Sequence, residues 1–133
     1  MGKQIKFLDL NKQYLSIKSQ IDTAIQNTIE NSSYVGGKAL DGFQLNFAQY
    51  QDAKHCIGVG NGTDALEIAL EALDLPFSSE VIVPSLTFIS SAEMVTRTGH
   101  KVVFCDINPE TYTIDIEDLK KKINPNTKCI VAV

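Results

Sequence analysis

Residues 59–66 are Val59-Gly60-Asn61-Gly62-Thr63-Asp64-Ala65-Leu66, an apolar run that leads through a glycine turn into a helix. Ile57 and Val59 favour a short strand before the turn, and an apolar stripe at helical spacing begins at Leu66. The first backbone N–H groups of a helix have no partner within the helix, so they can hold an anion. The predicted phosphate ligands are the amides of Gly62, Thr63 and Asp64, together with the hydroxyl of Thr63.

Two other interpretations fit parts of the same stretch. In an ordinary capped helix, Thr63 or Asp64 would be the N-cap, and Glu67 stands at capping-box spacing from Asp64. The relaxed G-x-G-x-x-A fingerprint of a nicotinamide-dependent oxidoreductase also matches, but it needs an acidic residue at the end of the next strand. Glu80 instead precedes that strand, which weakens this alternative. A Walker loop is excluded, because no Lys-Ser or Lys-Thr pair follows the glycines.

The composition is that of one globular domain. The chain has 133 residues, of which 44% are hydrophobic and 21% charged, and its net charge is −4. This acidic balance argues against nucleic-acid or membrane partners. No apolar run reaches the roughly 18 residues of a membrane span, and the polar start lacks a signal-peptide core, so we expect a cytoplasmic protein. The three cysteines stand far apart in apolar runs, which favours reduced thiols over disulfides or a metal site.

Helices and strands alternate along most of the chain. Two amphipathic helices are predicted first, over 14–30 and near 40–50, with a loop over 31–37 between them. After the glycine turn we predict helices over 63–74, 89–97 and 116–123, the last capped by Asp115, and strands over 80–83, 101–105 and 129–133. Strands that are apolar throughout are typical of a parallel sheet covered by helices, so the predicted fold class is α/β.

The last predicted strand, 129–133, has five apolar residues in a row. In open α/β sheets, ligand-binding groups lie just beyond the carboxyl ends of the strands. Because the sequence stops within this strand, we expect it to be the front part of a larger protein.

Several ordered motifs give the whole chain a resemblance to one family. They are the glycine turn 59–66, Val81–Phe88, Val103–Ile107, Phe7–Leu10, Tyr34–Gly37 and Asp106–Asp115. In these motifs the chain is similar to the N-terminal part of the DegT/DnrJ/EryC1/StrS family of pyridoxal-phosphate-dependent sugar aminotransferases, which have an aspartate-aminotransferase-like fold. The resemblance implies that 1–133 is the front of the large cofactor-binding domain. Residues 1–53 would be its helical segment and loop, and 54–133 the βα repeat with the cofactor-phosphate turn.

The resemblance also implies a function and a set of roles. The activity would move an amino group from an amino-acid donor, expected to be glutamate, onto a keto-deoxysugar attached to a nucleotide, in a homodimer that makes amino sugars for surface polysaccharides. Gly62, Thr63 and Asp64 would hold the phosphate of pyridoxal phosphate, Phe88 would stack on its pyridine ring, and Tyr34, Gly36 and Gly37 would lie near the sugar nucleotide. An aromatic face suits a planar cationic ring, although Phe88 could instead fill core space beneath the next helix.

The family's Schiff-base lysine and the carboxylate that keeps the pyridine nitrogen protonated come later in the family order. Ser33 and Lys38 match the family's serine-to-lysine spacing, but Lys38 precedes the glycine turn, so we reject it as the catalytic lysine. The sequence therefore assigns no catalytic residue, and the 133 residues alone are expected to be inactive. A non-catalytic module that binds a phosphate ligand is the alternative that such a chain would allow.

Overall fold

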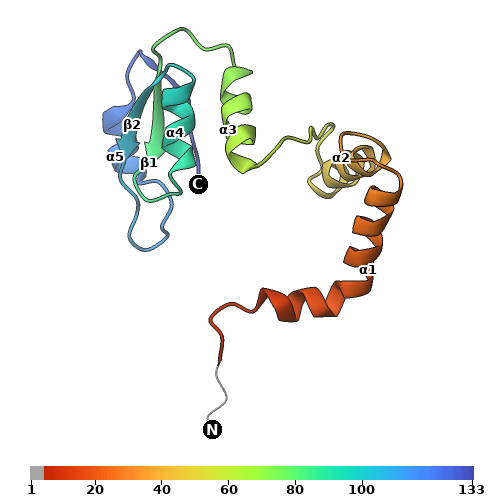
Figure 1. The fold of residues 1–133 in the computed structure, drawn as a ribbon. Helices are drawn as coiled ribbons and strands as arrows, with labels where there is room; N and C mark the ends of the chain where they lie inside the picture. Colours follow the sequence, from red (N-terminus) through yellow and green to blue (C-terminus); the bar gives the residue numbers. More distant parts are fainter. Residues whose placement is uncertain (1–4) are drawn as a thin grey trace. The chain divides into compact units, whose positions relative to one another are not determined.

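The structure is a computed structural model, and it describes residues 5–133 (Figure 1). We predicted from the polar start of the sequence that the chain has no signal-peptide core, and that start lies outside the described residues. The chain divides into two compact units, one ending at Gly58 and the other running from Val59 to Val133. Among the described residues, no helix is both long and apolar enough to cross a membrane.

The first unit contains helices α1 (Leu10–Glu30) and α2 (Lys38–Tyr50). Helix α1 begins four residues earlier than predicted, because the Asp9 side chain caps it by accepting a hydrogen bond from the Lys12 N–H at 3.1 Å. The connecting loop ends in Gly36 and Gly37, whose φ angles of 66° and 86° are strained for residues with a side chain. These two glycines allow the chain to turn sharply into α2.

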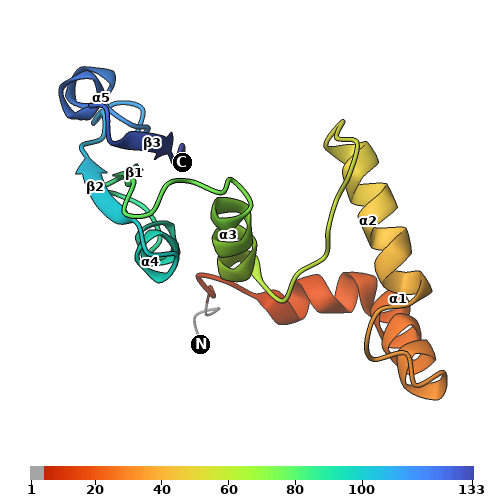
Figure 2. The ribbon, with the colours of Figure 1, turned by 90° about the horizontal axis from the view of Figure 1, so that it is seen from above.

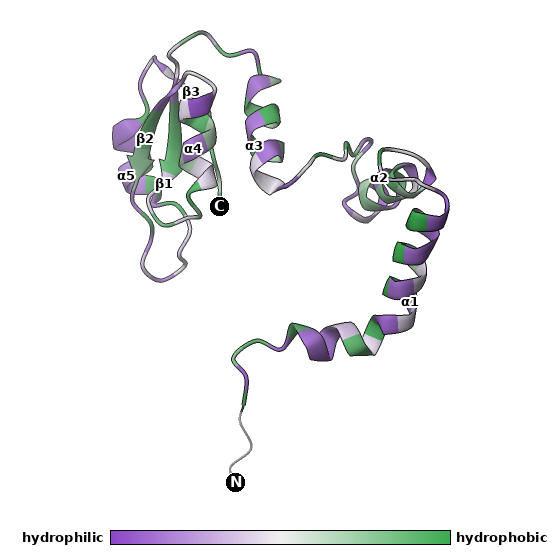
Figure 3. Ribbon diagram, viewed as in Figure 1, coloured by the Kyte–Doolittle hydropathy of each residue, from purple (hydrophilic) through white to green (hydrophobic). Residues whose placement is uncertain are grey.

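Both helices of this unit are amphipathic, as the spacing predicted (Figure 3). Helix α1 contains no buried residue, and its apolar stripe, Ile17, Ile21, Ile25 and Ile29, is between 39% and 55% exposed. On α2, Phe43 and Phe47 stack with their ring centroids 5.5 Å apart. The stripe of α1 is therefore not covered by the rest of its own unit.

The second unit is a three-stranded parallel sheet with helices on both faces. Its strands are β1 (Glu80–Pro84), β2 (Lys101–Cys105) and β3 (Thr127–Ile130), and their order across the sheet is β2-β1-β3. Helix α4 (Ser90–Arg97) joins β1 to β2, and α5 (Ile116–Lys122) joins β2 to β3 in the opposite direction. Right-handed crossovers in opposite directions place α4 and α5 on opposite faces, as Figure 2 shows. The predicted α/β class is confirmed.

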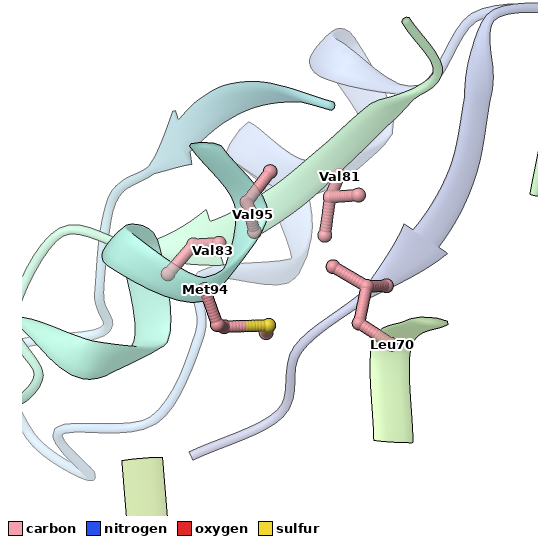
Figure 4. Packing of buried hydrophobic residues seen from close by; sticks show 5 residues of the cluster. All are labelled: Leu70, Val81, Val83, Met94 and Val95. Carbon is pink, nitrogen blue, oxygen red and sulfur yellow. The ribbon is translucent and has the colours of Figure 1, made fainter. Parts of the chain in front are cut away.

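The core lies between β1 and the helices α3 (Gly62–Glu71) and α4 (Figure 4). It contains Leu70 from α3, Val81 and Val83 from β1, and Met94 and Val95 from α4. Val81, Ile82 and Val83 are fully buried, and because alternate side chains of a strand point to opposite faces, Ile82 faces away from this cluster. Burial on both faces explains why β1 is apolar without interruption.

Two strand predictions need correction. Residues 57–59 form no strand, and Ile57 is 79% exposed, because β-prone residues need a neighbouring strand and none of the described strands pairs with them. The last strand covers 127–130 instead of 129–133, since its pairing with β1 already begins at Thr127 opposite Glu80. Val131 continues the ladder by donating its N–H to the Ile82 carbonyl at 2.9 Å.

Candidate functional site

Helices α3 and α4 begin side by side at the carboxyl end of β1. Thr63 is the second residue of α3, and Ser90 is the first residue of α4. Their hydroxyl oxygens lie 2.7 Å apart, which is a hydrogen bond between the first turns of the two helices. The arrangement places the glycine turn at the sheet edge where open α/β folds bind their ligands.

The residue that caps the N-terminus of α3 is neither Thr63 nor Asp64, the two candidates from the sequence. The N-cap is Asn61, whose side-chain oxygen accepts a hydrogen bond from the Asp64 N–H at 3.0 Å, so the assignment of Thr63 or Asp64 as N-cap is wrong. Asn61 caps the helix because it stands just before the first helical turn in an extended conformation. From there its side chain reaches the third amide of the helix. The amides of Gly62 and Thr63 have no hydrogen-bond acceptor among residues 5–133.

The Asp64 carboxylate points back across the turn. It accepts a hydrogen bond from the Asn61 side-chain amide at 3.0 Å, and a Cβ added at Gly60 would lie 2.5 Å from its Oδ2. Glycine at position 60 thus leaves room for this carboxylate. A Cβ added at Gly62 would meet no atom within 4 Å, so the backbone beside the two unpaired amides is open.

Phe88 stands in the loop between β1 and α4, two residues before Ser90. Its side chain is 74% exposed, so it does not fill the core beneath the next helix. A shallow concavity of about 450 Å³ is lined by Phe88 together with Asn61, Gly62, Thr63, Leu66 and Ser90. The structure therefore gathers an aromatic face, two free amides and the Thr63 hydroxyl at one place.

Tyr34, Gly36 and Gly37 belong to the other unit. The Tyr34 hydroxyl donates to the Ile29 carbonyl at 3.4 Å, and its ring is 67% exposed beside the end of α1. Gly37 lines a separate depression between α1 and α2 that includes Asn31 and Ser33. These residues form one exposed loop, and their role near a sugar nucleotide stays a prediction.

A charged cluster fixes the loop that follows β2. The Asp118 carboxylate accepts hydrogen bonds from the Asp106 N–H at 2.8 Å and from the Lys122 ammonium at 2.6 Å. These two interactions, in that order, lower the pKa of Asp118 to about 2. Burial, helped by the neighbouring Asp118, raises the pKa of the Cys105 thiol, so this cysteine is held as an unreactive thiol.

The predicted cap of α5 is confirmed, because the Asp115 side chain accepts hydrogen bonds from the backbone N–H groups of Glu117 and Asp118 at 2.7 and 3.1 Å.

Sequence reasoning missed Asn61 and Ser90 at this site. An asparagine directly before a helix start is a recognised N-cap signal and could have been found. A serine in the first turn of a helix has no comparable signal, because its partner Thr63 lies 27 residues away in the sequence.

Curated relatives match almost the whole of this chain. The UDP-2-acetamido-2-deoxy-3-oxo-D-glucuronate aminotransferase of Pseudomonas aeruginosa is 40% identical to it over 97% of this chain and 36% of that protein. The dTDP-3-amino-3,6-dideoxy-alpha-D-galactopyranose transaminase of Aneurinibacillus thermoaerophilus is 38% identical over 97% of this chain and 36% of that protein. The chain thus spans about a third of the length of the curated relatives it matches.

Solved structures give the same result. The crystal structure of DesV from S. venezuelae matches with a TM-score of 0.93 and 34% identity, over 98% of this chain and 35% of that one. NtdA from Bacillus subtilis, solved with its bound cofactor PMP, matches with a TM-score of 0.91 and 27% identity, over 99% of this chain and 31% of that one. The sequence model of the DegT/DnrJ/EryC1/StrS aminotransferase family matches residues 15–133. The resemblance seen in the motifs is confirmed, and the chain belongs to the DegT/DnrJ/EryC1/StrS aminotransferase family.

Proposed function

We propose that the protein carrying this chain is a pyridoxal-phosphate-dependent aminotransferase that exchanges the amino group of glutamate for the oxo group of a keto-sugar nucleotide. The observation that carries the proposal is the meeting of Thr63, Gly62 and Phe88 in one concavity at the carboxyl edge of the sheet. Family membership and the sugar-nucleotide transaminases among the relatives support the same reaction.

The residues at this concavity fit the cofactor. The free amides of Gly62 and Thr63 and the Thr63 hydroxyl are three donors for a phosphate, and the open space beside Gly62 leaves room for it. Asp64 would offer its own amide only if Asn61 releases it. The exposed ring of Phe88 would cover one face of the pyridine ring. Once bound, pyridoxal phosphate supplies the electron sink for amino-group transfer.

The remaining roles follow from the family. Tyr34, Gly36 and Gly37 would border the sugar nucleotide, and glycine at 36 and 37 allows the positive φ angles that this loop adopts. The uncovered apolar stripe of α1 supports a homodimer, since exposed stripes of this kind mark interfaces. The protein would act in the cytoplasm, in the biosynthesis of amino sugars and surface polysaccharides.

The test uses the purified full-length protein with pyridoxal phosphate, glutamate and a panel of keto-sugar nucleotides. We expect a cofactor absorbance band that borohydride bleaches, and equal amounts of 2-oxoglutarate and amino sugar. Binding without turnover of any substrate in the panel would favour the non-catalytic module. Reduction of the oxo group at the expense of a nicotinamide cofactor would favour the oxidoreductase.

A further inference from the structure

We propose that Ser90 is a positioning residue for the cofactor phosphate, acting through Thr63. In this arrangement the Ser90 hydroxyl donates to the Thr63 oxygen, and the Thr63 hydroxyl in turn donates to a phosphate oxygen. The inference rests on the proposed function, because it needs an anion at the start of α3. It adds a residue from a second helix to the phosphate site.

The Ser90 side chain depends on Thr63 for its hydrogen bond. Ser90 is only 4% exposed, and its side chain has Thr63 as its hydrogen-bond partner within the described residues, at 2.7 Å. A buried hydroxyl without a partner is costly, so this hydrogen bond is one that the protein retains. Ser90 and Thr63 both line the concavity, so this hydrogen bond lies at the wall of the proposed phosphate site.

The number of protons on the two hydroxyls determines the direction of the hydrogen bond between them. Each hydroxyl has one proton to donate, and in the absence of a ligand either oxygen of the pair can be the donor. If Thr63 gives its proton to a phosphate oxygen, the proton between the two hydroxyls must come from Ser90. The two hydrogen bonds then run in one direction, and each strengthens the other. Ser90 therefore determines where the Thr63 proton points.

The chain contains a matched control one residue away. Ser91 is 6% exposed, lies in the same turn of α4, and shares its hydroxyl with Thr87 at 3.0 Å. It has no hydrogen bond to Thr63 among the described residues. Ser90→Ala and Ser91→Ala thus remove the same group from equally buried positions, and only the first removes a partner of Thr63.

The experiment measures the affinity of the full-length apoprotein for pyridoxal phosphate by fluorescence titration, with the ³¹P resonance of the bound phosphate as a second readout. We expect Ser90→Ala to weaken binding about five-fold, the size of one ordinary hydrogen bond, and to shift the ³¹P resonance. Ser91→Ala should change neither, and Ser90→Thr, which keeps a hydroxyl, should restore both. Thermal unfolding of each variant shows whether its fold is retained.

The double variant of Ser90→Ala and Thr63→Val shows whether Ser90 positions Thr63 or contacts the phosphate directly. If Ser90 acts through Thr63, Ser90→Ala should add nothing in a Thr63→Val background, and additive losses would overturn the inference. A wild-type protein that binds no pyridoxal phosphate would overturn both this inference and the proposed function. If Thr63→Val weakens binding while Ser90→Ala leaves it unchanged, the inference alone fails.

Discussion

Asn61 and Asp64 are joined by two hydrogen bonds across the glycine turn. The Asn61 oxygen accepts from the Asp64 backbone N–H, and the Asn61 amide donates to the Asp64 carboxylate, both at 3.0 Å. The pair satisfies one helix amide and directs the carboxylate toward Gly60, where no Cβ obstructs it. The two preceding amides, Gly62 and Thr63, belong to residues that line the concavity and have no acceptor among residues 5–133.

Replacing Asn61 with alanine should destabilise the protein by about 1 kcal/mol, the usual cost of losing an N-cap side chain. The free energy of unfolding from urea titration measures this change. Asn61→Ser is the control, because serine caps helices about as well as asparagine and should keep most of the stability. An equal loss in both variants would mean that the side chain does more than cap α3.

Replacing Thr63 with valine should weaken cofactor retention. It removes a hydroxyl that would bond a charged phosphate, worth about 1.5–3 kcal/mol, or roughly ten- to a hundred-fold in affinity. Equilibrium dialysis with pyridoxal phosphate measures the change. Thr96→Val is the control, since within residues 5–133 the Thr96 hydroxyl bonds only the Glu93 carbonyl on the same helix. Unchanged affinity in Thr63→Val would restrict Thr63 to a structural role.

Replacing Phe88 with alanine should loosen the cofactor and shift its absorbance, because the aromatic cover of the ring is lost. The fold should survive, since the side chain is 74% exposed. Absorbance titration and thermal unfolding together measure both effects. Phe77→Ala, at another exposed phenylalanine outside the concavity, should leave the cofactor spectrum unchanged. A Phe88→Ala protein that fails to fold would contradict the assigned role.

Replacing Asp118 with asparagine should destabilise the protein at neutral pH and have less effect in acid. The native pKa of Asp118 is about 2, below its ordinary 3.8, so its carboxylate stabilises the fold above that ordinary value. This stabilisation is lost as the pH falls toward 2, where the native carboxylate takes up its proton. The difference in Tm between wild type and variant, measured from pH 7 downward, should therefore shrink.

Glu117→Gln is the control for that series. Glu117 pairs with Lys120 at 2.7 Å, but both side chains are well exposed, and such pairs contribute about 0–1 kcal/mol. Its Tm should stay close to that of the wild type at every pH. A constant difference between wild type and Asp118→Asn down to pH 2 would show that the charge of Asp118 does not stabilise the fold.

The second unit was predictable from sequence because its strands and helices are paired within the described chain. Val81 and Val83 contact helices on one face while Ile82 is buried on the other, and this double burial produces the continuous apolar run that predicts a parallel strand. The run at 57–59 has the same local character but no neighbouring strand, so local propensity could not decide it.

The details of the site were harder to predict for geometric reasons. Asn61, Thr63 and Asp64 can each cap a helix, and only the backbone conformation before the first turn selects Asn61. The sequence placed Gly62, Thr63 and Phe88 at one sheet edge because each was expected to follow a strand. The structure gathers them there although residues 57–59 form no strand. The contact between Thr63 and Ser90 depends on how α3 packs against α4, which no spacing within the sequence records.

Because α3 and α4 begin at the same place, the protein would select between the phosphorylated and the unphosphorylated form of pyridoxal. Each helix carries a partial positive charge at its first turn, and the hydrogen bond between Thr63 and Ser90 brings the two charges to one place. Their combined field favours a doubly charged phosphate over a neutral alcohol. The protein should therefore discriminate strongly between pyridoxal phosphate and unphosphorylated pyridoxal, and this preference should decline as added salt screens the two helix ends.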